Sequence, residues 1–255
     1  MHLLQNINKV GLFNIEHRTI MEYDSSDQDS VYNFAKKLTG KTLRDILSPQ
    51  IIQESENLFV NNGNKGRFGH KIEKHYFGYE INSNQGADFP CKLELKVTPV
   101  KLNMNGSLSP KERLVHNIIN FNEIVKETWH TSSLLKKISS ILLIRYLDPM
   151  NREINQLDYK ILDVQLINLS SNKEDFNQFE KDWNLIVSKI KDGKAHELSE
   201  SDTKYLGACT KGSTRELSQR SQPFSNEKAM QRAFSFKSQY MKILLERCPG
   251  MYDYL

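Results

Sequence analysis

The amino-acid sequence predicts a single α/β domain in which a mixed sheet is flanked by helices. Apolar residues recur at helical spacing in segments that end on a glycine. Other short segments are rich in aliphatic and β-branched residues, as strands are. The 255 residues, 38% of them hydrophobic, are enough to bury a core, and no internal repeat or long low-complexity linker divides them.

Three segments have the pattern of helices. "DSVYNFAKKLTGK" is predicted to end at Gly40, and "FGHKIEKHYFG" at Gly78. "NKEDFNQFEKDWNLIVSKIKDGK" is the clearest helix, because its apolar stripe from Phe176 to Ile190 repeats every three to four residues before Gly193. We also expect 225–247 to form two helices broken around Ser235, or one helix.

Four segments have the pattern of strands, and we expect them to form one sheet. The first follows a turn in "GADFPCKLELKVTPVK". The others are "ERLVHNIINF", "KISSILLIRYLD" and "YKILDVQLINL".

The first of these strands carries charged residues in an otherwise apolar pattern. Side chains alternate between the faces of a strand, so Lys92, Glu94 and Lys96 are predicted on the face opposite the leucines. With Asp88 in the turn before the strand, Glu94 would form a pair of carboxylates suited to Mg²⁺, and Lys96 could act on a metal-bound water. By itself, such a motif is more often an ordinary solvated strand face.

Composition limits the classes of protein to consider. The three cysteines are widely spaced, which favours neither a disulfide framework nor a zinc site, and the four histidines nearest these motifs show no ligand spacing. No run approaches the roughly 18 apolar residues of a membrane span, and the N-terminus lacks the pattern of a signal peptide. We therefore expect a cytoplasmic protein with no membrane partner.

Positive charge is concentrated near the C-terminus. The net charge is +4, but residues 203–247 contain nine basic and three acidic residues. Such a segment is typical of proteins that contact phosphates. A solvated basic surface is an equally good explanation of the charge alone.

Several blocks of the sequence resemble the MutH-related nucleases, which include a mismatch-repair nickase and type II restriction endonucleases that cut at GATC. The blocks run from about Gly66 to Leu245 and most resemble the catalytic N-terminal domain of the restriction enzymes. They are "GHKIEKHYFGYEINSNQGADFPCKLELKVTP", "SPKERLVHNIINFNEIV", "TSSLLKK", "GKAHELSESDTKYLGACTKG" and "SQPFSNEKAMQRAFSFKSQYM". The resemblance implies a PD-(D/E)xK nuclease core.

The resemblance also implies roles for individual residues. Asp88 and Glu94 match the metal-binding carboxylates, and Lys96 matches the catalytic lysine. Glu73 matches a helix glutamate that completes the site, and Lys137 matches a lysine near the scissile phosphate. Only five residues separate Asp88 from Glu94, where the family usually has six, so the turn between them is expected to be tighter.

The DNA contacts implied by the resemblance lie in the basic segment. Lys211, with Thr210 beside it, falls where the family places a base-reading loop, and Arg215 and Lys237 are expected to contact DNA as well. Ser235 stands where the nickase has a tyrosine that senses adenine methylation. The protein is therefore expected to cut methylated and unmethylated sites alike.

The function implied is Mg²⁺-dependent double-strand cleavage of DNA at a short palindrome such as GATC. The expected partners are double-stranded DNA, a second copy of the chain on that DNA, and a cognate DNA methyltransferase. The alternatives are a repair nickase and a catalytically silent DNA-binding module. Within one nuclease domain we expect a helical part (1–60), a catalytic core (66–192), and a recognition loop with a C-terminal helical part (194–247). The chain would be a single-domain member or the catalytic half of a longer enzyme.

Overall fold

The computed structural model describes residues 23–59, 67–79, 86–151, 153–214 and 216–255. The helices in these ranges are α1 (Gln28–Lys36), α2 (Leu43–Ile46), α3 (Pro49–Phe59), α4 (Arg67–Lys71), α5 (Phe121–Ile124), α6 (Ser133–Ile138), α7 (Lys173–Lys191) and α8 (Ser238–Glu246). The predicted helix after Phe68 is present, but its second half is a π-helical turn, η1 (Ile72–Tyr76). The three helical segments with glycine ends are thus confirmed.

A four-stranded mixed sheet lies at the centre of the fold, in the order β2-β1-β4-β5. Its strands are β1 (Glu94–Leu102), β2 (Leu108–Pro110), β4 (Ser140–Leu147) and β5 (Ile161–Asn168). β1 runs parallel to β4, whereas the β1–β2 and β4–β5 pairs are antiparallel. The prediction of an α/β fold with a mixed sheet is confirmed.

A separate antiparallel sheet contains the strand from "ERLVHNIINF". This strand, β3 (Leu114–Ile118), pairs with β9 (Arg232–Phe236), which pairs with β6 (Leu206–Thr210). A hairpin of β7 (Gln219–Gln222) and β8 (Ser225–Met230) precedes β9. The prediction that all four strand segments share one sheet is therefore wrong for β3.

The prediction of helices throughout 225–247 is also wrong. Helix α8 is present, but β8 and β9 occupy the region from Ser225 to Phe236. On β9, Phe234 and Phe236 pack into the core with α7 and α8, so the side chains follow the period of two of a strand. In the sequence, only the short alternation in "AFSF" indicates this strand, and the residues before it favour a helix.

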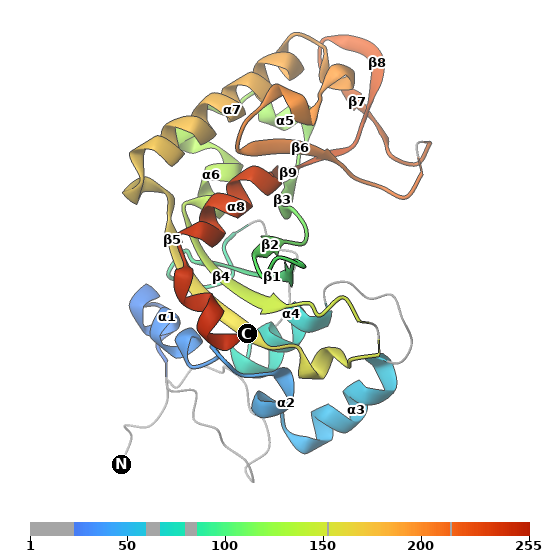
Figure 1. The fold of residues 1–255 in the computed structure, drawn as a ribbon. Helices are drawn as coiled ribbons and strands as arrows, with labels where there is room; N and C mark the ends of the chain where they lie inside the picture. The colour runs from blue at the N-terminus through green and yellow to red at the C-terminus, as the bar shows by residue number, and fades with distance from the viewer. Residues whose placement is uncertain (1–22, 60–66, 80–85, 152, 215) are drawn as a thin grey trace, which may run out of the picture.

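Both faces of the four-stranded sheet are covered by hydrophobic clusters. On β4, Leu142 and Ile144 pack with α1, α2 and α4, whereas Ile141 and Leu143 pack with α6, α7 and the second sheet. Figure 1 shows α1–α3 at one end of the molecule and α7 with β6–β9 at the other, with the four-stranded sheet between them. A charged side chain at the start of β1, such as Glu94, is therefore buried beneath another layer of the protein.

Within the described ranges, no helix combines the length and the apolar character that crossing a bilayer requires.

Candidate active site

The turn before β1 brings Asp88 back against the strand. Lys92 has a left-handed backbone (φ 62°), and the Lys92 N–H donates to the carbonyl oxygen of Phe89 at 2.9 Å. The Leu95 N–H then donates to Asp88 Oδ2 at 2.8 Å. This tight turn accommodates the short spacing between Asp88 and Glu94. It also removes Lys92 from the face of the strand, where the sequence pattern had predicted it.

Glu94 is buried between the two layers of the molecule. In the parallel register it lies beside Ile141, whose side chain faces α6 and α7, and it is only 1% exposed. Its Oε1 atom is 2.7 Å from Lys96 Nζ and 3.4 Å from Lys137 Nζ. Its Oε2 atom is buried and has no hydrogen-bond partner among the described residues. A solvated strand face is therefore excluded for Glu94.

Two more carboxylates, those of Asp88 and Glu73, lie near Glu94 and Lys96. Burial raises the pKa of Asp88, and the neighbouring Glu94 raises it further. Burial also raises the pKa of Glu73, on η1, with opposing contributions from His70 and Lys96 and further increases from Asp88 and Glu94. The structure therefore brings together the residues assigned to the catalytic site, which are Glu73, Asp88, Glu94, Lys96 and Lys137.

The donor set fits a hard divalent cation bound by few protein ligands. No group of three or more His, Cys, Asp or Glu side chains in the described part of the chain is placed to hold a metal ion. Mg²⁺, however, usually keeps several waters and takes only one or two carboxylates together with substrate phosphate. The unpartnered Glu94 Oε2 is the kind of buried acceptor that a cation would satisfy. Asp88 and Glu94 are thus the residues that could hold a metal.

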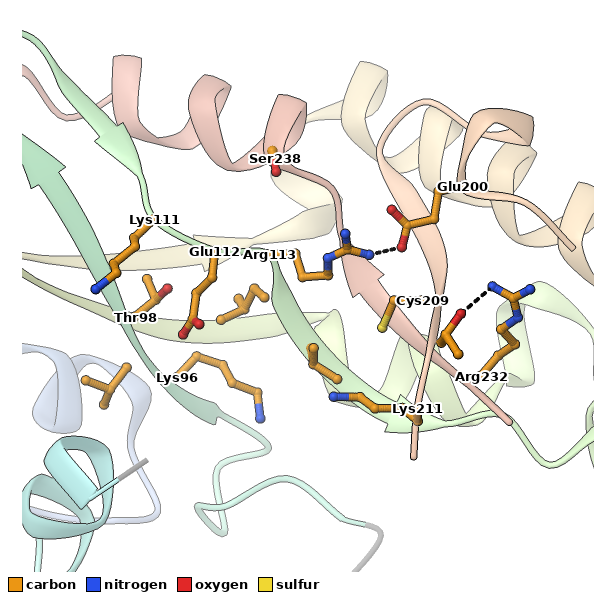
Figure 2. A pocket seen from close by; sticks show the side chains of 14 residues that line it. Lys96, Thr98, Lys111, Glu112, Arg113, Glu200, Cys209, Lys211, Arg232 and Ser238 are labelled. Carbon is orange, nitrogen blue, oxygen red and sulfur yellow. Dashed lines mark hydrogen bonds and ion pairs between the residues drawn. The ribbon is translucent and has the colours of Figure 1, made fainter. Parts of the chain in front are cut away.

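A basic cleft of about 930 Å³ opens beside this site. Figure 2 shows Lys96, from β1, and Lys211, beyond the end of β6, pointing into it from opposite sides. Five basic residues and two acidic residues line the cleft: Lys96, Lys111, Arg113, Lys211, Arg232, Glu112 and Glu200. Lys111 pairs with Asp148, and Arg113 pairs with Glu200. The two other basic residues, Lys211 and Arg232, favour an anionic ligand in the cleft, beside Lys96.

The predicted DNA-contacting residues are not all in this cleft. Thr210 and Lys211 line it, whereas Arg215 lies outside the described residues. Ser235 is fully buried in the middle strand of the second sheet, between Val115 and Gly207. The Lys237 ammonium donates to the carbonyl oxygens of Glu200 (2.6 Å) and Thr203, so it is occupied inside the protein.

Two features of the site were missed by the sequence analysis. Lys111 and Arg113 line the cleft from the segment before β3, and only the folded arrangement brings them opposite Lys211. His116, to which we assigned no chemistry, packs on Phe236 with ring centroids 4.3 Å apart, and both its ring nitrogens are buried without a partner among the described residues. Burial, and then the charges of Lys96 and Lys137, lower the His116 pKa well below its usual value. The sequence could have indicated that the His116 ring faces the core, because His116 lies two residues after Leu114 and therefore on the same face of β3.

A mixed sheet whose interior strand carries Glu94 and Lys96, with Asp88 in the turn before it, is the fold and site of the PD-(D/E)xK nuclease class. Comparison with known proteins shows which members of that class the chain resembles. Residues 77–182 match the family model described as the DNA mismatch repair enzyme MutH. It is also 37% identical over 221 residues to the type II restriction enzyme Sau3AI of Staphylococcus aureus. That match covers 86% of this chain, which spans only 42% of the relative's length.

Proposed function

We propose that the chain is the catalytic part of a type II restriction endonuclease that makes Mg²⁺-dependent double-strand cuts in DNA, at GATC. The environment of Glu94 carries this proposal. One of its oxygens contacts two lysines, and the other has no hydrogen-bond partner in the part of the chain that the structure describes, immediately beside a basic cleft. The similarity to the type II restriction enzyme Sau3AI supports the restriction activity, and the choice of GATC follows from the family that the sequence resembles.

In the proposed mechanism, Asp88 and Glu94 would hold Mg²⁺, which would supply Lewis-acid polarisation of the scissile phosphate and activation of a water. Lys96 orients that water for in-line attack on phosphorus. Lys137, held on the other side of Glu94 Oε1, offsets the negative charge that develops on the phosphate. The bond from phosphorus to the 3′ oxygen breaks, which leaves a 5′-phosphate and a 3′-hydroxyl. Glu73 completes the acidic cluster from η1.

The cleft supplies the DNA contacts in this proposal. Basic side chains that line it contact backbone phosphates, while Lys211 and Thr210 reach base edges. Arg215, four residues after Lys211 in the sequence, contacts the DNA as well. Ser235 is buried, and the Lys237 ammonium is bonded to carbonyl oxygens. In this proposal both residues therefore support the DNA-binding surface from inside the protein. Residues 66–192 form the catalytic core, and 194–247 the recognition part, of one nuclease domain.

A role in restriction also predicts the partners of the protein and its cellular compartment. We propose that it acts on double-stranded DNA in the cytoplasm as a pair of copies, and that a cognate methyltransferase protects the host DNA. A repair nickase would share the site but would depend on an activating partner. A silent DNA-binding module would have no use for the lysine pair around Glu94.

Incubation of the protein with plasmid DNA and Mg²⁺, followed by mapping of the ends, tests the proposal. We expect linear products cut at GATC, no cleavage with a chelator, and equal rates on adenine-methylated and unmethylated plasmid. Lys96→Ala is expected to reduce the rate by a factor of about 100 or more. Lys101→Ala, on the same strand but outside the cleft, is the matched control and should cut normally.

The other outcomes identify the alternatives. Slow nicking that requires an added protein indicates a nickase, and DNA binding without cleavage indicates a silent module. Cleavage that is unaffected by Lys96→Ala contradicts the proposed site.

A further inference from the structure

The described residues 211–214 and 216–218 follow β6 and belong to a loop whose two ends meet, and we call these residues the recognition loop. Both of its ends are tied to Gln231, the single residue between β8 and β9. The Lys211 N–H donates to the Gln231 carbonyl oxygen at 2.8 Å, and the Gln231 N–H donates to the Ser218 carbonyl oxygen at 2.7 Å. The side chain of Gln231 also accepts a hydrogen bond from Arg220 Nη2 at 2.9 Å. The base of the loop is therefore closed by backbone hydrogen bonds within the protein.

The packing of Gly212 on Ser218 closes the loop further. Gly212 has φ +111°, a conformation that residues with a side chain rarely adopt. A Cβ atom at Gly212 would lie 2.6 Å from Ser218 Cβ and would overlap its hydroxyl oxygen. Rotation of the hydroxyl cannot relieve the contact between the two Cβ atoms. Because Ser218 is only 1% exposed, it has little room to move away.

The hairpin that follows the loop is anchored to the end of α7. Gly193 has φ +72°, and a Cβ atom there would lie 2.7 Å from the Phe224 carbonyl oxygen at the hairpin tip. Gln222 accepts a hydrogen bond from the Ala195 N–H at 2.7 Å and donates to the Glu227 carbonyl oxygen at 2.8 Å. The β7–β8 hairpin beside the recognition loop is thus held at its tip by the end of α7 and at its base by Gln231.

We propose that the recognition loop is held in its DNA-reading shape before DNA binds, and that Gly212 is the residue that sets this shape. The inference rests on the proposed function, because it assigns this loop to sequence discrimination. A preformed loop loses little conformational entropy on binding. It also cannot rearrange to fit a wrong base pair, so a mismatch leaves polar groups unpaired.

Three variants of the full chain test the inference. Gly212→Ala introduces the clash, and Gly212→Ala/Ser218→Gly removes the Ser218 atoms that cause it. Gly106→Ala is the matched control, because Gly106 also has a positive φ (+79°) but has no atom within 4 Å of the added Cβ. Two quantities are measured for each variant. The first is hydrogen exchange of the Lys211 and Gln231 amides without DNA, and the second is the ratio of cleavage rates on a GATC duplex and on duplexes with one base pair changed.

We expect slow amide exchange in the wild-type protein and in Gly106→Ala. In Gly212→Ala, exchange should accelerate and the cleavage ratio should fall about tenfold, the discrimination that one base contact provides. The double variant should recover most of both quantities. Fast exchange in the wild-type loop, or a cleavage ratio that Gly212→Ala leaves unchanged, overturns the inference. If the wild-type protein cuts no DNA, the proposed function fails together with the loop's role in discrimination, whereas the exchange data still decide whether the loop is preformed.

Discussion

Glu94 shows how the protein keeps an acidic side chain in its interior. An isolated buried carboxylate is strongly unfavourable, but Lys96 and Lys137 both contact one of its oxygens. Lys96 is two residues away, so the alternation of a strand predicts their contact. Lys137 is 43 residues away and arrives on α6. No periodicity in the sequence could place it there, and its position was predicted only from the resemblance to a known family.

Asp88→Asn is expected to stabilise the metal-free protein at neutral pH. Burial, and then Glu94, raise the pKa of Asp88, so the native state binds this proton more tightly than the unfolded chain does. The stability that results is present in acid and is lost as the pH rises through the native pKa. Asparagine avoids this loss and can still accept the Leu95 N–H. Thermal unfolding between about pH 4 and pH 7.5 should show a midpoint a few degrees higher for the variant, with the difference confined to the upper part of the range.

Addition of Mg²⁺ provides the control for this prediction. A cation that binds only the native state raises its stability by mass action. Mg²⁺ should therefore raise the unfolding midpoint of the wild-type protein more than that of Asp88→Asn. An Asp88→Asn protein that is less stable than wild type at neutral pH would show instead that the carboxylate holds the turn together.

At the scale of elements, Asp182 links the longest helix to the strand that leads into the recognition loop. It is 3% exposed on α7 and accepts hydrogen bonds from three consecutive backbone N–H groups, those of Lys204, Tyr205 and Leu206, at 2.6–3.1 Å. The Gln178 side chain donates to the same carboxylate at 2.8 Å. This one side chain fixes where β6 begins.

Asp182→Ala is expected to lower the free energy of unfolding by about 3 kcal/mol, because it leaves several donors without a partner. Asp192→Ala is the matched control, since Asp192 is an exposed residue beyond the end of the same helix, and a change of less than about 0.5 kcal/mol is expected there. Denaturant unfolding of both variants gives the comparison. Equal stabilities would show that water replaces the carboxylate.

The elements also show where sequence patterns mislead. The stripe on α7 spans about four turns, so its period is unambiguous, and the helix was predicted correctly. The "NEKAMQRAF" segment consists mostly of residues that favour helices, yet it forms parts of β8 and β9. Pairing of β9 with both β3 and β6 supplies its backbone hydrogen bonds and overrides the local preference. Such partners are distant in sequence, so short strands of this kind cannot be predicted from their own residues.

At the scale of the whole molecule, the cleft is a product of tertiary structure. Its walls come from β1, from the segment before β3, from the end of β6 and from β9. The sequence indicated that basic residues gather near the C-terminus, but Arg232 and Lys237 are bonded to backbone carbonyl oxygens, and Arg247 pairs with Asp175 and does not line the cleft. Three of the five basic residues that line the cleft, Lys96, Lys111 and Arg113, come from outside that segment, and each is paired with a carboxylate. Local charge density therefore predicted an anionic ligand but not the surface that meets it.

A palindromic target predicts the assembly that acts on it. The described part of the chain contains one Glu94 and Lys96 site, and each strand of the duplex presents one scissile phosphate. Two chains related by a two-fold axis would place one site on each strand and would read the two half-sites identically. We expect sedimentation of the protein with a short GATC duplex to show two chains per duplex, and cleavage to give linear product with little nicked intermediate.

A duplex in which one half-site is altered provides the control. Only one chain can then make its base contacts, so the complex with two chains should weaken, and cleavage should slow on both strands together. A protein that forms a complex with one chain per duplex and cuts the strands in two independent steps would contradict this arrangement. In that case each chain would have to leave the first strand and bind again in the opposite orientation, and nicked DNA would accumulate at low protein concentration.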